Sequence, residues 1–439
     1  MKDLLRKGFT LLKSVTKKGF FEIIVGNTLV KAIAALSGLF VPRLLSTYDY
    51  GLLAFVDTVI TYILLANGLG LIVAILRYCS LHDDPQKKKA IYCFALKWGV
   101  IFDAVLITVS IPLILSLPLP FEEARVYLLF AAGLPMVTLI FESFSIYLRA
   151  NFENKRFAKL SVIFTVFSAG LQILLAWGFK VYGALSARYI AYIIASGVGF
   201  WMVCKATGFL KTEKSPLDKN EKKDMVKYAI GAMFAAAFSI IMPLNEQFMI
   251  SLLLKNEEIS GLYRAATLLP ANLQFITMSV VVFIFPYFAR HSNDGQWIWK
   301  RFLQMTAGLA VVMGSFICIC LLFTPQITQI VFGEEYMGAV GTMRLMWVTF
   351  GINAVFRMPS VNLLAAIGMV KFSTINSIVS AIVHIILDYF FITRYGFAGA
   401  AMALTVAYGL SSVINFVYLK IKTNELIKNQ GVLSNESNK

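Results

Sequence analysis

The sequence predicts an all-α polytopic membrane protein with 12 transmembrane helices in two pseudo-symmetric six-helix bundles. Its 439 residues are 58% apolar and only 15% charged, far from the balance of a water-soluble domain. Apolar runs of about 20 residues, long enough to cross roughly 30 Å of hydrocarbon, recur along the whole chain. Only helices and closed barrels satisfy the backbone in lipid, and continuous rather than alternating apolar runs favour helices.

The predicted spans begin close to the N-terminus. The basic stretch "MKDLLRKGFTLLKSVTKKGFF" precedes an apolar run to Leu45 that is too long for a signal-peptide core, so we expect a retained first span. The predicted spans are 22–45, 51–76, 91–117, 126–148, 159–179, 183–204, 227–254, 262–289, 301–324, 343–367, 372–392 and 397–420.

Lysine and arginine are distributed unequally between the two sides of these spans. Of the 40 basic residues, 29 lie in connections on one side and 5 on the other, which predicts that both termini are cytoplasmic. The net charge of +16 is therefore an orientation signal facing anionic inner-leaflet lipid, and requires no nucleic acid partner. The tyrosines expected to anchor the outer ends at the membrane interface are Tyr48, Tyr50, Tyr127, Tyr263 and Tyr336.

The chain contains an internal repeat. The longest hydrophilic stretch, "KTEKSPLDKNEKKDMVK", predicts an N-terminal bundle over 1–210, a cytoplasmic linker over 211–226 and a C-terminal bundle over 227–439. "KVYGALSARYIAY" before the sixth span matches "RYGFAGAAMALTVAY" before the twelfth, with Gly183 aligned to Gly396. The small residues in both segments permit close helix packing. Duplicated halves make a substrate path between them the default hypothesis.

Three stretches resemble a known family: "VPRLLSTYDYGLLAFVDTVITYILLANGLGLIVAILRY", "LNEQFMISLLLKNEEISGLYRAATLL" and "YGFAGAAMALTVAYGL". In them the chain resembles the polysaccharide (O-antigen type) flippases of the multidrug/oligosaccharidyl-lipid/polysaccharide (MOP) exporter superfamily. The resemblance implies a MATE-like V-shaped fold and alternating access. The implied cargo is an undecaprenyl-pyrophosphate-linked oligosaccharide, an O-antigen or capsule repeat unit, moved to the outer leaflet of the bacterial inner membrane. The implied partners are membrane lipid and the polysaccharide polymerase or glycosyltransferases of the pathway.

Basic side chains inside the predicted spans are the candidates for binding this anionic cargo. A charge in mid-bilayer costs about 2.5 to 3.5 kcal/mol, so each requires a partner or a water-filled cavity. Lys31 and Arg357 lie too deep to reach headgroups, and guanidinium groups suit phosphate oxygens. Arg264 and Arg344 lie near outer helix ends, where snorkelling explains them equally well. The substrate-binding candidates are Lys31, Lys97, Arg188, Arg264, Arg344 and Arg357.

The alternative for the deep cations is an internal ion pair. A buried cation is stable when an acidic side chain of a neighbouring helix neutralises it. The available acidic partners are Asp57, Asp103 and Glu142.

Four further residues form a candidate ion-coupling site. Glu246 and Asp388 lie at comparable depth in the seventh and eleventh spans, with Asn245 beside the first and His384 one turn from the second. Two carboxylates with an amide suit Na⁺ or share a proton, and the sequence leaves both ions open. The structural alternative pairs Glu246 with a neighbouring cation and Asp388 with His384. The five cysteines and three histidines lack metal-ligand spacing, so we expect no cofactor and no other metal.

Two other functions compete with the flippase. A multidrug/cation antiporter shares the scaffold, but several buried cations suit a cationic drug poorly. A membrane glycosyltransferase or polysaccharide polymerase usually requires a sizeable outer loop or several acidic loop residues, and "STYDYG" offers only Asp49. The sequence therefore favours a transporter over an enzyme.

Overall fold

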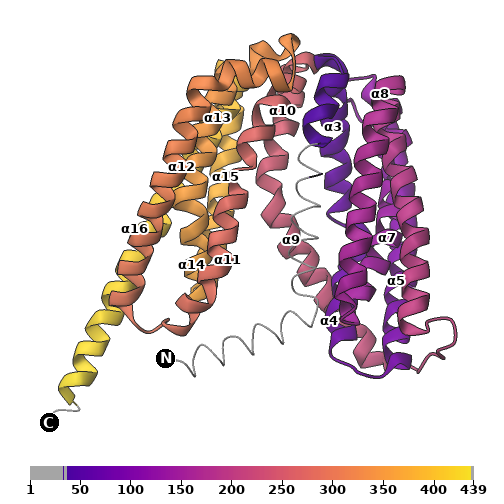
Figure 1. Cartoon of the computed structure of the whole chain (residues 1–439), viewed down its shortest axis with the longest axis horizontal. Coiled ribbons are helices and arrows are strands. Elements are labelled where there is room, and N and C mark those ends of the chain that lie inside the picture. Colours follow the sequence, from indigo (N-terminus) through magenta and orange to yellow (C-terminus); the bar gives the residue numbers. More distant parts are fainter. Residues whose placement is uncertain (1–32, 34–36, 437–439) are drawn as a thin grey trace. The chain divides into compact units, whose positions relative to one another are not determined.

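The computed structural model describes residue 33 and residues 37–436, and every regular element within these limits is a helix (Figure 1). The contacts divide the chain between Ile240 and Ile241 into unit 1 and unit 2. The first helices are α3 (Thr47–Leu64), η1 (Asn67–Gly70), α4 (Leu71–Ser80), α5 (Pro85–Ser116), α6 (Ala124–Ala131), α7 (Leu134–Ala150), α8 (Asn154–Thr207) and α9 (Lys219–Leu254), which crosses the division. Unit 2 continues with α10 (Glu257–Ala271), α11 (Gln274–Arg290), α12 (Gly295–Val331), η2 (Glu334–Ala339), α13 (Val340–Ile352), η3 (Asn353–Arg357), α14 (Met358–Ala366), α15 (Val370–Tyr395) and α16 (Phe397–Glu436).

The helices follow the predicted spans. By length and apolar composition, seven helical segments of the described chain are able to cross a membrane, and the bent pair α3–α4 would make an eighth. To within one residue, the second to twelfth predicted spans each lie within one helix, half of α8, or a short series of helices. Most of the first predicted span lies outside the described residues. The part of it that is described is helical over 37–44. The limits predicted for the two bundles and the linker remain predictions.

Five of the described helices begin directly after a side chain that accepts a hydrogen bond from the backbone of the first turn. Such caps satisfy amide groups that have no partner within the helix, and Ser, Asp and Asn serve best. In α5 the cap is followed by Pro85, whose ring suits the first helical position. The connections therefore fix where these helices start. The capping residues are Ser46 of α3, Asp84 of α5, Asp218 of α9, Asn256 of α10 and Asp294 of α12.

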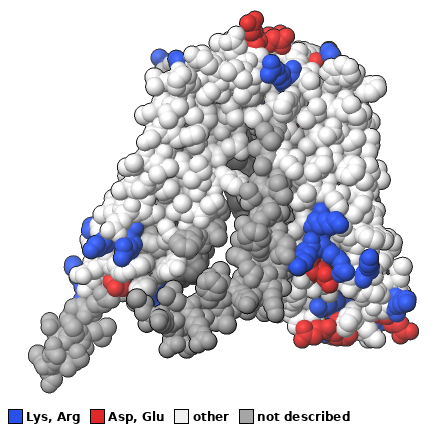
Figure 2. Space-filling view, viewed as in Figure 1, with Lys and Arg blue, Asp and Glu red and all other residues white. Residues whose placement is uncertain are grey.

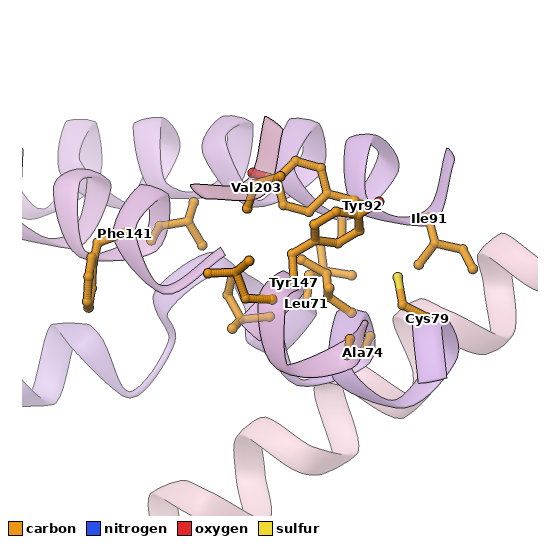
Figure 3. Close-up of a cluster of buried hydrophobic side chains, with 14 of the residues drawn as sticks. Leu71, Ala74, Cys79, Ile91, Tyr92, Phe141, Tyr147 and Val203 are labelled. Atoms are coloured by element: carbon orange, nitrogen blue, oxygen red, sulfur yellow. The ribbon is translucent and has the colours of Figure 1, made fainter. Parts of the chain in front are cut away.

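Unit 1 is held by an apolar core between α4, α5, α7, α8 and the first turns of α9. Figure 3 shows part of it, with Tyr92 and Tyr147 among the aliphatic side chains of the neighbouring helices. The rings of these two tyrosines lie 4.7 Å apart, and the Tyr92 hydroxyl lies 3.0 Å from the Ser143 hydroxyl. Met225 and Ala229 belong to the same core, so the beginning of α9 packs on unit 1. A separate core in unit 2 joins α11, α12, α14 and α16.

The second predicted span is not one straight helix. The chain bends by 44° between α3 and the η1–α4 segment. Gly68, Leu69 and Gly70 have φ values of 55°, 53° and 70°, in the left-handed region that glycine adopts readily. The Gly68 amide donates to Oδ1 of Asp103, a fully buried residue of α5, over 2.7 Å. Hydrocarbon cannot hydrate a free amide, so this carboxylate supports the break.

The repeat is visible at two equivalent helix junctions. Lys180, within α8, has φ 50° and ψ −127°, which interrupts the helix between the fifth and sixth predicted spans. Gly396, between α15 and α16, has φ 61° and ψ −149° at the corresponding junction of unit 2. The same unusual backbone conformation therefore joins the last two spans of each half.

Just after each junction, a glycine packs against the preceding helix. A Cβ atom on Gly183 would lie 1.8 Å from the Leu175 carbonyl oxygen, and one on Gly399 would lie 2.0 Å from that of Phe391. An offset of 216 residues relates both the glycines and the carbonyls they approach. The predicted close packing of small residues is confirmed. The predicted alignment of Gly183 with Gly396 was wrong by three residues. Gly183 corresponds to Gly399, and Gly396 corresponds to Lys180 at the junction within α8.

Replacing either of these glycines with alanine is expected to destabilise the protein. The new methyl group meets a backbone carbonyl that no rotamer change can move, and overpacking of this kind costs about 1 to 3 kcal/mol. The measurement is the thermal unfolding midpoint of Gly183→Ala and Gly399→Ala in detergent. Gly178→Ala and Gly409→Ala are matched controls, because nothing lies within 4 Å of a Cβ there. Equal losses in controls and test variants would contradict the packing argument.

Candidate functional site

Glu246 lies in a buried polar cluster of unit 2. It is carried by α9 and is 3% exposed. Tyr263, on the first half of α10 and 2% exposed, donates from its hydroxyl to Glu246 Oε2 over 2.6 Å. Hydrogen bonds to a charged acceptor are shorter and stronger than neutral ones. The phenol therefore supplies a hydrogen-bond donor to a side chain that is almost completely buried.

His384 and Asp388 complete the cluster from one face of α15. Both are fully buried. His384 Nε2 lies 3.1 Å from Glu246 Oε1 and 3.4 Å from Asp388 Oδ1. Asn245 of α9 donates from Nδ2 to Asp388 Oδ2 over 3.0 Å. The structure thus brings together all four residues predicted to couple an ion, and their role remains a prediction.

Two carboxylate oxygens of this cluster face the imidazole of His384. Glu246 Oε1 and Asp388 Oδ1 make no hydrogen bond to any described residue, and neither does His384 through Nδ1 or Nε2. Unsatisfied buried polar atoms are rare and call for an explanation. A proton on Nε2, or on either facing oxygen, would supply the missing donor between these groups. The predicted pairing of Asp388 with His384 and a proton site are therefore both compatible with this geometry.

A pocket of about 320 Å³ opens beside Glu246. Its lining includes Glu246 and Tyr263 from the cluster, together with Arg264 and Phe350. Arg264 is half-buried and makes no ion pair with any described residue. The pocket therefore opens beside an otherwise buried acidic side chain, and the guanidinium group of Arg264 belongs to the same lining.

Arg357 is held in a π-helical turn between α13 and α14. It lies at the end of η3, where the wider turn replaces the regular helix expected from the sequence. Its guanidinium carbon lies 4.8 Å from the centre of the Tyr408 ring, and Nε and Nη1 donate over 3.3 Å to Ser411 Oγ and Asn353 Oδ1. Single π turns occur often at functional sites. Arg357 is thus held by aromatic and neutral polar groups of α16 and its own turn, and its substrate role remains a prediction.

Arg188 is bound to an acidic partner. Its two terminal nitrogens donate to the two carboxylate oxygens of Asp57 on α3, with Nη2 2.9 Å from Oδ2. The side chains are only 24% and 19% exposed. This fork-to-fork geometry favours the ion-pair alternative for Arg188.

The remaining predicted cations are placed differently from one another. Lys97 is exposed on α5 and Arg344 is exposed on α13, and neither makes an ion pair within the described chain. Lys97 lines a groove of unit 1. Lys31 lies outside the described residues.

The sequence assigned Tyr263 to the wrong environment. Tyr50, Tyr263 and Tyr336 are 6%, 2% and 1% exposed, so the prediction that these three anchor the membrane interface is wrong. A usable signal existed, because Glu246 lies nine residues before Lys255 and Tyr263 eight residues after it. A tight connection there places the two side chains at equal depth on adjacent helices.

A family model of polysaccharide biosynthesis proteins matches residues 40–341 of the chain. Several solved structures are similar over nearly the whole chain. An inward-facing multidrug resistance MATE family transporter of the MOP superfamily has a TM-score of 0.73 at 15% identity, covering 92% of this chain and 99% of its own. The lipid II flippase MurJ, in an inward closed conformation, has a TM-score of 0.69 at 15% identity and 92% coverage of both chains.

A MOP superfamily transporter from Pyrococcus furiosus, described as having a binding pocket of reverse polarity, has a TM-score of 0.60 at 14% identity, covering 92% and 94%. No curated protein sequence matches. At these identities the likeness shows the fold, and the predicted MATE-like helical membrane fold is confirmed.

Proposed function

Because the chain belongs to the polysaccharide biosynthesis protein family, we propose that it is a flippase that moves a lipid-linked oligosaccharide between the leaflets of a bacterial cytoplasmic membrane. The proposed cargo is a sugar repeat unit on undecaprenyl pyrophosphate. The observation that carries the proposal is that a polysaccharide family match and a transporter fold occur in one chain. The proposal also includes transport by alternating access and a topology with both termini in the cytoplasm.

Basic side chains in the helical units support an anionic cargo. Arg264 in unit 2 and Lys97 in unit 1 make no ion pair with a described residue, and both line pockets. A pyrophosphate diester presents several charged oxygens, for which ammonium and guanidinium groups are the natural donors.

The proposed coupling ion is a proton that binds at Glu246, His384 and Asp388. Two unsatisfied carboxylate oxygens suit Na⁺ in charge, because Na⁺ takes oxygen ligands. However, His384 Nε2 lies within 3.1 Å and 3.4 Å of these oxygens, where it competes with a metal ion for the same space. A proton requires no extra room, and histidine titrates near neutral pH. The geometry therefore supports proton coupling better than sodium coupling.

The second candidate function is a multidrug/cation antiporter, which the likeness to a multidrug resistance transporter favours. A cationic drug would meet Arg264 beside Glu246 in the pocket of unit 2 and the lysines of the groove in unit 1. Like charges oppose such binding. A membrane glycosyltransferase or polymerase gains no support from the similar folds.

Deletion of the gene is expected to trap sugar-loaded undecaprenyl carriers on the cytoplasmic side of the membrane, because synthesis continues while transport stops. The measurement is lipid analysis by mass spectrometry, combined with the accessibility of the sugar to an added glycosidase in right-side-out vesicles. A plasmid copy of the wild-type gene is the control and should restore accessibility. Absence of loaded carriers would indicate a synthetic enzyme. Normal carriers with increased drug sensitivity would indicate the antiporter.

A further inference from the structure

A groove of about 1080 Å³ lies in unit 1 between α5 and the first turns of α9. Its α5 wall runs from Phe94 to Val105, about 16 Å of helix. Its α9 wall runs from Lys222 to Ile230, about 12 Å. Both walls lie in the same unit, and the groove is open to the surface.

The groove carries four lysines and no acidic residue. Lys97 comes from α5, and Lys222, Lys223 and Lys227 come from α9. None of the four makes an ion pair with a described residue. The nearby Glu221 is already bound to Lys87, with Nζ 2.5 Å from Oε1, and this bond lowers the pKa of the Glu221 carboxyl. Figure 2 shows basic side chains gathered on the lower part of unit 1.

The charged and apolar parts of the groove are separated along its length. A Cβ on Gly70 would lie 2.5 Å from the Ala229 carbonyl oxygen, and one on Gly99 would lie 3.6 Å from Gly68 Cα. These contacts place the turn of Ala229 and the turn of Gly99 at a similar depth. Lys222 and Lys223 therefore lie below this depth, on the side where both helices begin.

From Trp98 onward, the α5 wall of the groove is apolar. Trp98, Ile101 and Val105 line the groove and are 50%, 42% and 56% exposed. Val109 and Leu113 continue the exposed stripe along α5 at 53% and 49%. The groove thus offers ammonium groups at one end and an unpartnered apolar surface at the other, as a phosphorylated lipid requires.

We propose that this groove is a docking site for the pyrophosphate group and first isoprenyl units of the lipid-linked cargo, separate from the Glu246 cluster. The identity of the cargo rests on the proposed function. Four ammonium groups match a pyrophosphate diester, with two negative charges, better than a phospholipid phosphodiester with one. All the residues that line the groove belong to unit 1, so the carrier lipid docks on this unit before transport begins.

The test is binding of geranylgeranyl pyrophosphate to the purified full-length protein in zwitterionic nanodiscs, measured by native mass spectrometry. The Lys222→Gln/Lys223→Gln variant is expected to bind about tenfold more weakly, because two charge-assisted contacts are lost. Lys97→Gln, on the opposite wall, is expected to weaken binding in the same direction. The matched control Lys211→Gln/Lys214→Gln removes two exposed lysines that do not line the groove, and should bind like the wild type.

Three outcomes would overturn the inference. The first is equal affinity of the groove variants and the control, with all proteins showing the wild-type thermal unfolding midpoint. The second is equally strong binding of phosphatidylglycerol with the same sensitivity to the variants, which would assign the groove to bulk phospholipid. The third is equally strong binding of inorganic pyrophosphate, which would exclude any contribution from the apolar wall.

This inference and the proposed function fail in different experiments. If deletion traps loaded carriers but the groove variants bind the probe normally, only the docking site is excluded. If deletion traps no carrier, the proposed function fails even when the groove binds a polyprenyl pyrophosphate.

Discussion

Replacing Glu246 with glutamine, or Asp388 with asparagine, is expected to reduce proton-driven transport at least about tenfold while the protein remains folded. Both changes keep the size of the side chain and remove one of the two carboxylates that face His384 Nε2. In the Glu246→Gln variant the amide oxygen is still able to accept the hydrogen bond from Tyr263, so the packing of α9 on α10 is preserved. What is lost is the group whose charge changes when the proton binds.

The measurement uses proteoliposomes loaded with a lipid-linked oligosaccharide, with a pH gradient or a sodium gradient imposed separately. The wild type is expected to respond to the pH gradient. Glu258→Gln is the matched control, because it removes an exposed carboxylate from the first turn of α10 in the same unit. A wild type that responds only to sodium would replace the proton with Na⁺ as the coupling ion. Unchanged gradient dependence in Glu246→Gln and Asp388→Asn would exclude both residues from coupling.

The helices were predictable because lipid allows few solutions. Hydrocarbon leaves only the helix for a continuous apolar run, so length and composition located the spans from the second to the twelfth. The irregular turns were harder. Two glycines in "NGLG" permit the left-handed break at Gly68, but only Asp103, on another helix, stabilises it. Sequence reasoning confined to one span cannot foresee a partner contributed by the next.

The candidate site could be predicted as far as the depth of each residue in the membrane can be counted along its predicted span. Glu246 and Asp388 are far apart in the chain, yet equal depth in the membrane was enough to expect that they meet. His384 followed from helical periodicity. Tyr263 was missed because a tyrosine near a span end is typical of the interface, and only the burial of Glu246 makes a phenol donor necessary. The partner of Arg188 could not be chosen among three acidic residues, since that depends on which helices pack together.

Replacing Asp57 with asparagine is expected to destabilise the protein by about 3 kcal/mol. Arg188 would keep its charge in a largely buried position and lose both bonds to the carboxylate. Breaking a buried ion pair from one side typically costs about 3 to 5 kcal/mol, because the remaining charge is left without compensation. The measurement is unfolding of the purified protein in detergent. Glu425→Gln is the control, since it breaks the pair with Lys422, in which the side chains are 54% and 30% exposed, and exposed pairs contribute at most about 1 kcal/mol.

The double variant Asp57→Leu/Arg188→Met separates structure from transport. Replacing both partners with apolar side chains of similar volume is often neutral or stabilising, so stability is expected to return close to the wild-type value. If Arg188 serves only α3–α8 packing, this variant should also transport the lipid-linked oligosaccharide at the wild-type rate. Restored stability with transport still lost would show that the guanidinium group contacts the cargo, and would return Arg188 to the substrate-binding residues despite its bond to Asp57. If stability is not restored, the Asp57–Arg188 pair contributes more to the stability of the fold than the mutual neutralisation of two charges in an apolar surrounding.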